Sequence, residues 1–250
     1  MANHTTPETE QSADMPVRPL RPRTVRVRDH SPWRLRFAQI HNTLRERITL
    51  LTYPPGTRLD LDELAQEFEV SRTPIRNVLQ RMEHEGLVHT RHGVGTAVAE
   101  VDFDHIREAT LLRMHLAQVI GSLNPQLPDQ TALDLIDGLS ARIRRLADKQ
   151  DYEEYVRIDL HLHQCISSQI GNELLLRSYD ELFFQTVRMW YSYLPLMHWE
   201  AEVASFTDHI ELTRGAMQRG DVKAVGLITR NAISSGLFRM DQALVASAQS

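Results

Sequence analysis

The order of structural signals along residues 32–100 constrains the fold of this chain more than any other feature. Three segments carry apolar residues at three- and four-residue steps, which is the period of an amphipathic helix. A Tyr-Pro-Pro-Gly run at residues 53–56 ends the first segment, and Gly86 ends the third. Two strand-like runs follow at residues 87–91 and 96–99, with glycines between them. Three helices and a small β-hairpin in this order predict a winged helix-turn-helix.

Capping residues indicate where two of these helices begin. Asp60 and Glu63 have the spacing of a capping box, in which each side chain can bond the other's end of the first turn. Ser71 or Thr73 can cap the third helix, and Pro74 suits its first turn because no backbone N–H is needed there.

The segment from residue 101 to 247 is predicted to form a separate, all-α domain. Its apolar residues keep the helical period, and Asp151 with Glu154 repeats the capping-box spacing. We expect six helices, near residues 103–123, 130–148, 152–170, 173–193, 201–219 and 222–246. Short connections between six helices indicate a bundle, so the predicted fold class is mainly α.

Charge is distributed unevenly along the chain, whose formal net charge is −5. Residues 15–99 contain 14 Arg and no Lys against nine Asp or Glu, whereas residues 100–250 contain 14 Lys or Arg against 21 Asp or Glu. A basic N-terminal half joined to an acidic C-terminal half is expected when only one half meets phosphate.

The first 31 residues have no apolar periodicity and are predicted to be disordered. They carry five arginines: Arg18, Arg21, Arg23, Arg26 and Arg28. Two readings stay open for this segment, a solvated tail and an arm that enters a DNA minor groove.

Composition argues against a membrane or exported protein. No stretch approaches the roughly 20 consecutive apolar residues of a membrane-spanning helix. The N-terminus lacks the apolar centre of a signal peptide, and the single cysteine, Cys165, cannot form an internal disulfide. We therefore expect a cytoplasmic protein with no membrane partner.

The third helix carries side chains suited to reading DNA bases. Arg72, Thr73, Arg76, Asn77 and Gln80 lie away from its apolar residues. Arginine can bond guanine O6 and N7 together, and Asn or Gln can do so with adenine. The alternative is an exposed amphipathic helix without a partner.

These residues occur within a longer pattern that resembles the GntR superfamily of bacterial regulators. The pattern comprises Pro55-Gly56-Thr57-Arg58-Leu59, Glu63-Leu64-Ala65, Val70-Ser71-Arg72-Thr73-Pro74-Ile75-Arg76, Val78-Leu79, Met82-Glu83, Glu85-Gly86-Leu87-Val88 and Gly95-Thr96-Ala97-Val98.

The resemblance implies double-stranded DNA as the partner of the first domain. It implies that Arg72, Thr73 and Arg76 contact DNA, and that His92 and Gly93 at the wing tip approach the minor groove. Two positions depart from the pattern. An acidic residue, Asp62, stands where members often have a basic residue that touches phosphate, and Asn77 stands where they usually have Glu.

The second domain resembles the FCD ligand domain of the FadR branch, in its six-helix, VanR-like group. The resemblance is carried by Asp159-Leu160-His161-Leu162-His163, Gly171-Asn172 with Leu174, His209 with Ala216, Gly220-Asp221 and Ala224. It implies a homodimer and a small-molecule effector. Arg113 matches a family arginine near the cavity and is expected to pair with an effector carboxylate.

A polar group is predicted inside the helical domain. Asp159 and His163 are four residues apart and so share one helix face. In the family, such a pair and two later histidines bind a divalent metal, and here His209 and Asn231 take the later positions. Zinc or a similar metal is expected, with a metal-free, hydrogen-bonded polar cluster as the alternative.

Together these features predict a sequence-specific transcription regulator rather than an enzyme. A homodimer would bind a pseudo-palindromic operator, and a carboxylate effector would modulate its affinity. The alternative function is a metal-dependent enzyme with its centre at Asp159, His163 and His209.

Overall fold

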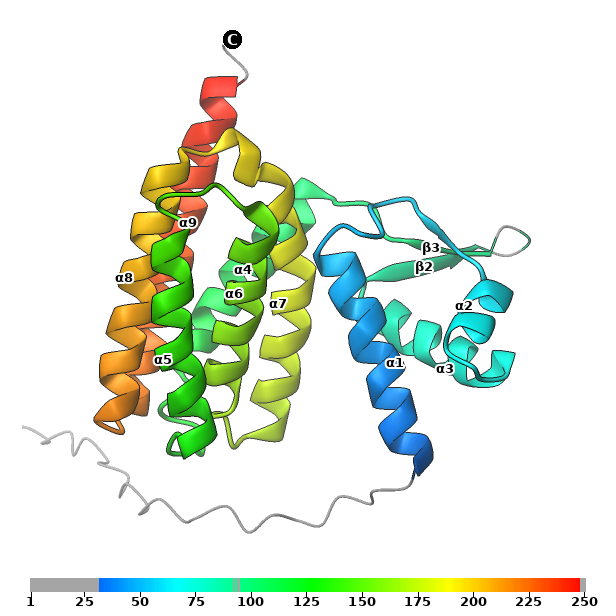
Figure 1. Cartoon of the computed structure of the whole chain (residues 1–250), viewed down its shortest axis with the longest axis horizontal. Coiled ribbons are helices and arrows are strands. Elements are labelled where there is room, and N and C mark those ends of the chain that lie inside the picture. Colours follow the sequence, from blue (N-terminus) through cyan, green and yellow to red (C-terminus); the bar gives the residue numbers. More distant parts are fainter. Residues whose placement is uncertain (1–31, 92, 94, 248–250) are drawn as a thin grey trace, which may run out of the picture.

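The computed structural model describes residues 32–91, 93 and 95–247, which form a smaller and a larger lobe (Figure 1). The smaller lobe contains α1 (Pro32–Thr49), β1 (Arg58–Leu59), α2 (Leu61–Glu67), α3 (Arg72–His84), β2 (Val88–Arg91) and β3 (Gly95–Val98). The larger lobe contains α4 (Phe103–Gln118), α5 (Gln130–Arg145), α6 (Tyr152–Ser167), α7 (Glu173–Tyr193), a 3-10 turn (Leu194–Leu196), α8 (Trp199–Gln218) and α9 (Val222–Ser247). The predicted arm of residues 1–31, and His92, lie outside the described residues.

The smaller lobe is a winged helix-turn-helix, as predicted. The inner faces of α1, α2 and α3 meet in one core with the sheet, formed by Ile40, Leu44, Leu64, Ile75, Val78, Leu79, Met82 and Val98. The sheet has the strand order β1-β3-β2, and both pairs are antiparallel. The third strand, β1, is a short extended run before Asp60 that adds to the predicted two-strand hairpin. Its two residues pair with β3 in the register Arg58↔Ala97 and Leu59↔Thr96.

The predicted helix caps are partly confirmed. Asp60 Oδ1 accepts hydrogen bonds from the backbone N–H of Asp62 at 2.7 Å and of Glu63 at 3.2 Å. Ser71 occupies the N-cap position of α3, one of the two predicted alternatives, but its side chain makes no capping hydrogen bond. An N-cap hydroxyl bonds the N–H of the second or third helical residue, and the third here is Pro74, which has none.

The larger lobe is a bundle of six α-helices, as the helical period predicted. α5 packs between α6 and α8, α9 packs against α4 and α8, and α4 also packs against α7. The predicted helices at residues 103–123, 130–148 and 152–170 end earlier than expected. Buried apolar residues such as Ile120, Leu146 and Ile170 continue the pattern into the turns that follow, which extends the apparent helix.

None of the helices in the described part of the chain combines the length and apolar character required to cross a membrane.

Candidate functional site

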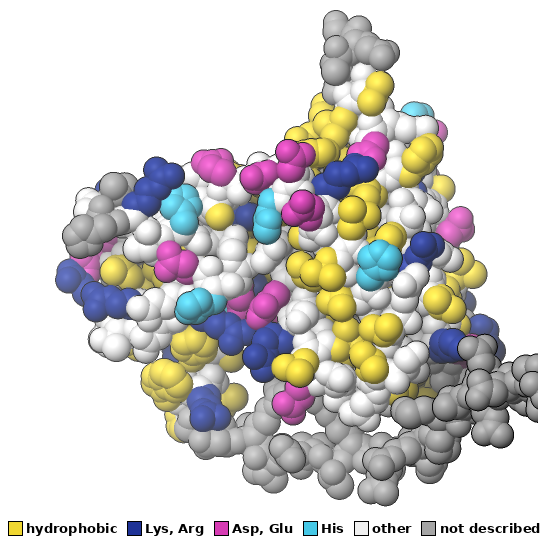
Figure 2. All heavy atoms as spheres, turned by 180° about the vertical axis from the view of Figure 1, so that it is seen from behind, with side chains coloured by type: hydrophobic (Ala, Val, Ile, Leu, Met, Phe, Trp, Pro, Cys, Tyr) yellow, Lys and Arg dark blue, Asp and Glu magenta, His cyan; other side chains and the backbone are white. Residues whose placement is uncertain are grey.

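A groove lies between α3 and the wing in the smaller lobe. Its wall includes Arg72, Arg76 and Gln80 from α3, Arg58 from β1, and Thr90, Gly95 and Thr96 from the wing strands. Thr73 is exposed and Asn77 is half-buried, and neither lines the groove. The structure thus brings two of the predicted arginines and Gln80 into one groove, whose wall also carries Asp60, Asp62 and Glu83. Figure 2 shows Lys and Arg side chains towards the outer end of this lobe.

Arg58 is a groove residue that sequence reasoning did not select. It is exposed on β1, and its guanidinium lies 3.5–3.9 Å from the position that a Cβ on Gly95 would occupy. Because β1 pairs with β3, this side chain reaches the wing. The signal was present in the Pro-Gly-Thr-Arg-Leu run, but the pairing that places it is not local in sequence.

Arg72 is joined to Asp62 across the interhelical turn. Asp62 Oδ1 accepts a hydrogen bond from Arg72 Nε, and Asp62 Oδ2 accepts one from Arg72 Nη2 at 2.5 Å. The Asp62 side chain is 62% exposed and the Arg72 side chain is 65% exposed. Both line the groove. The acidic departure from the family pattern therefore contacts a predicted DNA-reading residue.

Gly93 occupies the tip of the turn between β2 and β3. It is exposed with φ +77°, a left-handed conformation that favours glycine. A Cβ there would have no atom within 4 Å, so the tip has open space around it.

A cavity lies inside the larger lobe, walled by α4, α6, α7, α8 and α9. Its polar wall comprises Thr110, Arg113, Asp159, Thr186, Ser205, His209 and Arg239. Its apolar wall comprises Tyr155, Val187, Met189, Trp190, Phe206, Ala232, Ile233, Gly236, Leu237 and Met240. Such an apolar pocket with a few converging polar groups is typical of a small-molecule site.

Arg113 is held in the cavity wall by aromatic rings and one hydroxyl. Its guanidinium lies 4.8 Å from the centroid of the Phe183 ring, and its Nη1 donates to Thr186 Oγ1 at 3.1 Å. Its Nε is buried without a partner among the described residues. Because a buried donor without a partner is costly, this group is available to a ligand acceptor.

Asp159 and His209 face the same cavity with unusual ionisation. Burial raises the pKa of Asp159 to about 6, although the positive charge of Arg113 opposes this shift. Burial lowers the pKa of His209 to about 4, and Arg113 lowers it further. His209 is therefore neutral near pH 7, and its Nε2 is buried without a partner in the described part of the chain.

Replacing Asp159 with asparagine is expected to stabilise the fold at pH 7.5. The carboxyl group of an unfolded Asp has a pKa of about 3.8, whereas the pKa of Asp159 in the folded chain is about 6. Its charge therefore lowers stability as pH rises from 3.8 to 6, and this cost is fully present above pH 6. We expect the free energy of unfolding to rise by about 1–3 kcal/mol at pH 7.5 and to change little at pH 4.

Denaturant unfolding at both pH values measures this effect. Asp208→Asn, an exposed position on α8, is the control. An equal gain at both pH values would show that a charge on Asp159 is not the cause.

His163 makes its polar contact away from the cavity. It does not line the cavity, and its Nε2 lies 2.9 Å from Asp180 Oδ1. Burial lowers the pKa of His163 to about 4 despite this carboxylate. The neutral ring therefore donates from Nε2 to Asp180, and its Nδ1 is buried without a partner among the described residues.

The four residues of the predicted metal site do not lie around one point in the structure. Asp159 and His209 line the cavity, whereas Asn231 is exposed and accepts a hydrogen bond from Arg230 at 2.9 Å. Within residues 32–91, 93 and 95–247, no three His, Cys, Asp or Glu side chains are placed to hold a metal ion. The described arrangement does not fit a metal site, and metal binding stays a prediction.

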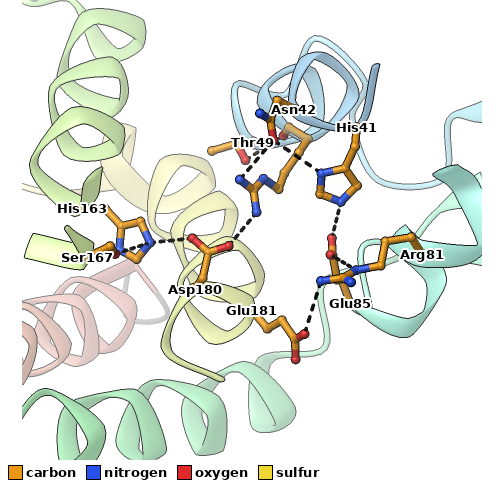
Figure 3. A network of polar contacts seen from close by, with 10 residues as sticks. His41, Asn42, Thr49, Arg81, Glu85, His163, Ser167, Asp180 and Glu181 are labelled. Carbon is orange, nitrogen blue, oxygen red and sulfur yellow. Dashed lines mark hydrogen bonds and ion pairs between the residues drawn. The ribbon is translucent and has the colours of Figure 1, made fainter. Parts of the chain in front are cut away.

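α7 lines the cavity and also contacts the winged lobe, a link that sequence reasoning missed. Figure 3 shows the polar contacts around Asp180. Asp180 bonds His163 through Oδ1, and its Oδ2 accepts from Arg45 of α1 at 2.7 Å. Burial raises the pKa of Asp180, but the His163 hydrogen bond and the Arg45 charge outweigh burial, so the net pKa is lowered. The guanidinium of Arg45 also lies 3.7 Å from the centroid of the Phe184 ring.

A second set of contacts joins α7 to the end of α3. Gln185 Nε2 donates to the backbone oxygen of Glu85 at 2.9 Å, beside Gly86, whose φ is +71°. The Glu85 carboxylate is buried and bonds His41 at 2.8 Å and Arg81 at 2.6 Å. α7 therefore contacts α1 and the C-terminal end of α3.

Comparison with known proteins supports this division of the chain. The model of the gntR family of bacterial regulatory proteins matches residues 37–98, and the FCD domain model matches residues 108–235. An uncharacterised HTH-type transcriptional regulator of Streptomyces ambofaciens is 34% identical over 134 residues, 53% of this chain and 56% of that protein. The chain therefore spans little more than half the length of that relative. The fatty acid metabolism regulator protein of Shewanella amazonensis is 26% identical over 214 residues, 74% of this chain and 82% of that protein.

Solved structures share the fold. E. coli McbR/YncC has a TM-score of 0.68 at 17% identity, covering 83% of this chain and 97% of that one. A putative GntR regulator from Rhodococcus sp. RHA1 has a TM-score of 0.59 at 18% identity, covering 85% and 99%. With both domain models in order and an FCD match over about half its length, the chain belongs to the gntR family of bacterial regulatory proteins and carries an FCD domain.

Proposed function

We propose that this chain is a transcription regulator that binds a DNA operator through α3 and the wing. The groove that carries Arg58, Arg72 and Arg76 is the observation on which this proposal depends. Arginines at the start of a recognition helix are placed to reach base edges, and a wing beside it can reach the backbone or the minor groove.

Selection of genomic DNA fragments by the purified full chain, followed by sequencing, tests this function. We expect enrichment of a few fragments that share a sequence. Recovery of fragments in proportion to their abundance would contradict the proposal.

The proposal includes a homodimer on a pseudo-palindromic site. Exposed apolar side chains occur on α4 and α9, which pack against each other: Leu111, Leu112, Leu227 and Phe238. Figure 2 shows hydrophobic side chains gathered on a face of the larger lobe. An exposed apolar face of this kind is consistent with a two-fold contact between copies of the chain, which would double the readout of each α3.

The proposed effector is a small carboxylate bound in the helical cavity. Arg113 Nε and His209 Nε2 lack partners among the described residues, and a carboxylate can accept a hydrogen bond from the arginine. Tyr155, Trp190 and Phe206 would cover the apolar part of such a molecule.

Arg113→Ala is expected to remove most of the effector affinity. A hydrogen bond to a charged group contributes about 1.5–3 kcal/mol, so the Kd should rise about 10- to 150-fold. Thermal unfolding with a panel of small carboxylates finds the compounds that stabilise the natural chain, and titration then gives both affinities. Arg177→Ala, an exposed arginine on α7, is the control. Unchanged affinity in Arg113→Ala would show that this arginine does not hold the carboxylate.

The proposed regulation is a shift between two placements of the winged lobe. An effector changes operator affinity only as far as it binds the two placements unequally. α7 supplies Thr186, Val187, Met189 and Trp190 to the cavity and also bonds α1 and the end of α3. A ligand that moves α7 would therefore act on the contacts that position α3.

A divalent metal at Asp159, His163 and His209 stays a prediction of the family resemblance. The unpartnered histidine nitrogens support it, whereas the arrangement of the described residues does not. Elemental analysis of the purified chain tests it, and His209→Ala should lower any stoichiometric metal content. No observation in the described structure favours the enzyme alternative.

A further inference from the structure

We propose that Asp62 fixes the guanidinium of Arg72 so that Arg72 reads guanine. The inference rests on the proposed DNA-binding function and goes beyond it, because it assigns the base specificity to a pair of residues. Asp62 would then be a positioning residue that acts on DNA only through Arg72.

The hydrogen bonds determine which edge of the guanidinium remains free. Asp62 accepts from Nε and from Nη2 of Arg72, which occupies the edge between these two nitrogens. Arg72 has no other hydrogen bond among the described residues, so the edge between Nη1 and Nη2 keeps one N–H on each nitrogen. Two parallel donors of this kind match O6 and N7 of guanine.

Stability does not explain the pair. Both side chains are more than half exposed, and an exposed ion pair contributes only about 0–1 kcal/mol. Orientation does explain it, because a free arginine loses rotamer freedom when it binds, and a side chain already held by a partner loses less. The pair also lies in the groove wall beside Arg76 and Gln80.

Because Asp62 is negatively charged, the two roles it could have predict different changes in DNA affinity when it is removed. A carboxylate in the groove repels phosphate, so it lowers affinity for every duplex. If it also positions Arg72, its removal raises affinity for random DNA while it weakens guanine recognition. A carboxylate that only repels would raise affinity for all duplexes alike when removed.

The test uses the full chain and the DNA site that it selects from genomic fragments. Each guanine of the site is replaced in turn by 7-deazaguanine, which lacks the N7 acceptor, and Kd is measured for the natural chain and for Asp62→Ala. Glu63→Ala removes the same charge from the neighbouring exposed position and is the control. Asp62→Asn retains one acceptor and is a second variant, and circular dichroism confirms that each variant is folded.

In the natural chain, at least one guanine replacement should raise Kd about 5- to 150-fold, as expected when one donor of a bidentate contact loses its acceptor. In Asp62→Ala the same replacement should raise Kd less than three-fold, and random duplex should bind equally well or more tightly. Asp62→Asn should lie between them, and Glu63→Ala should keep the full guanine penalty. If Asp62→Ala keeps the full penalty at every guanine of the site, the inference alone is overturned. A natural chain without preference for any fragment would overturn the proposed function as well.

Discussion

Arg76→Ala is expected to weaken binding to the selected DNA site by about 1–3 kcal/mol, roughly a 5- to 150-fold rise in Kd. Arg76 is exposed in the groove wall one helical turn after Arg72. It has no hydrogen bond or ion pair with the rest of the described chain, so its whole donor fork is available to DNA. Fluorescence anisotropy with the selected site and a shuffled duplex measures the effect.

The comparison between the two duplexes decides what Arg76 contacts. Loss of a base contact lowers affinity for the selected site far more than for the shuffled duplex, whereas loss of a phosphate contact lowers both alike. Arg145→Ala removes the same charge from an exposed position on α5 and should leave both affinities nearly unchanged. Equal losses for both duplexes in Arg76→Ala would remove Arg76 from the set of base-reading residues.

Asp180→Asn is expected to lower the free energy of unfolding by about 1–3 kcal/mol and to weaken the link between the two lobes. The Asp180 carboxylate bonds His163 at 2.9 Å and Arg45 at 2.7 Å. The His163 side chain is 5% exposed and the Arg45 side chain is 19% exposed. Loss of the Asp180 charge therefore leaves a largely buried Arg45 guanidinium without its negatively charged partner. Denaturant unfolding of the full chain measures the stability change.

The same variant tests the proposed route of regulation. Operator Kd is measured with and without a carboxylate that stabilises the natural chain, and the ratio of the two values gives the coupling. We expect this ratio to approach one in Asp180→Asn. Glu181→Gln is the control, because Glu181 lies next in the chain and its contact with Arg81 is long, at 3.9 Å. Equal behaviour of the two variants would show that the His163–Asp180–Arg45 contacts do not couple the lobes.

Local patterns in the sequence predicted the helices and the wing hairpin well. The helix predicted at residues 173–193 has the same bounds in the structure, and Asp60 and Asp151 both accept capping bonds. These features depend on residues within one or two helical turns of each other. The period of apolar residues and the side-chain oxygens of the caps are therefore sufficient to specify them.

Contacts between distant segments could not be predicted in this way. Asp62–Arg72 and Asp180–Arg45 depend on how helices cross, which no local spacing encodes. Asn231 shows that an error of one residue in position changes such a prediction. Ala232 and Ile233 line the cavity, but Asn231 is exposed, because each residue turns about 100° around a helix axis. A position inferred from family spacing alone can therefore face solvent.

Mapping of guanine N7 contacts on the selected fragment, by methylation interference, shows whether α3 reads bases. We expect two clusters of interfering guanines in successive major grooves, about 34 Å apart or a multiple of this, related by two-fold symmetry. Arg76→Ala should lose interference at equivalent positions in both clusters. No interference at any guanine, with the natural chain bound equally to the selected and shuffled duplexes, would contradict base readout by α3.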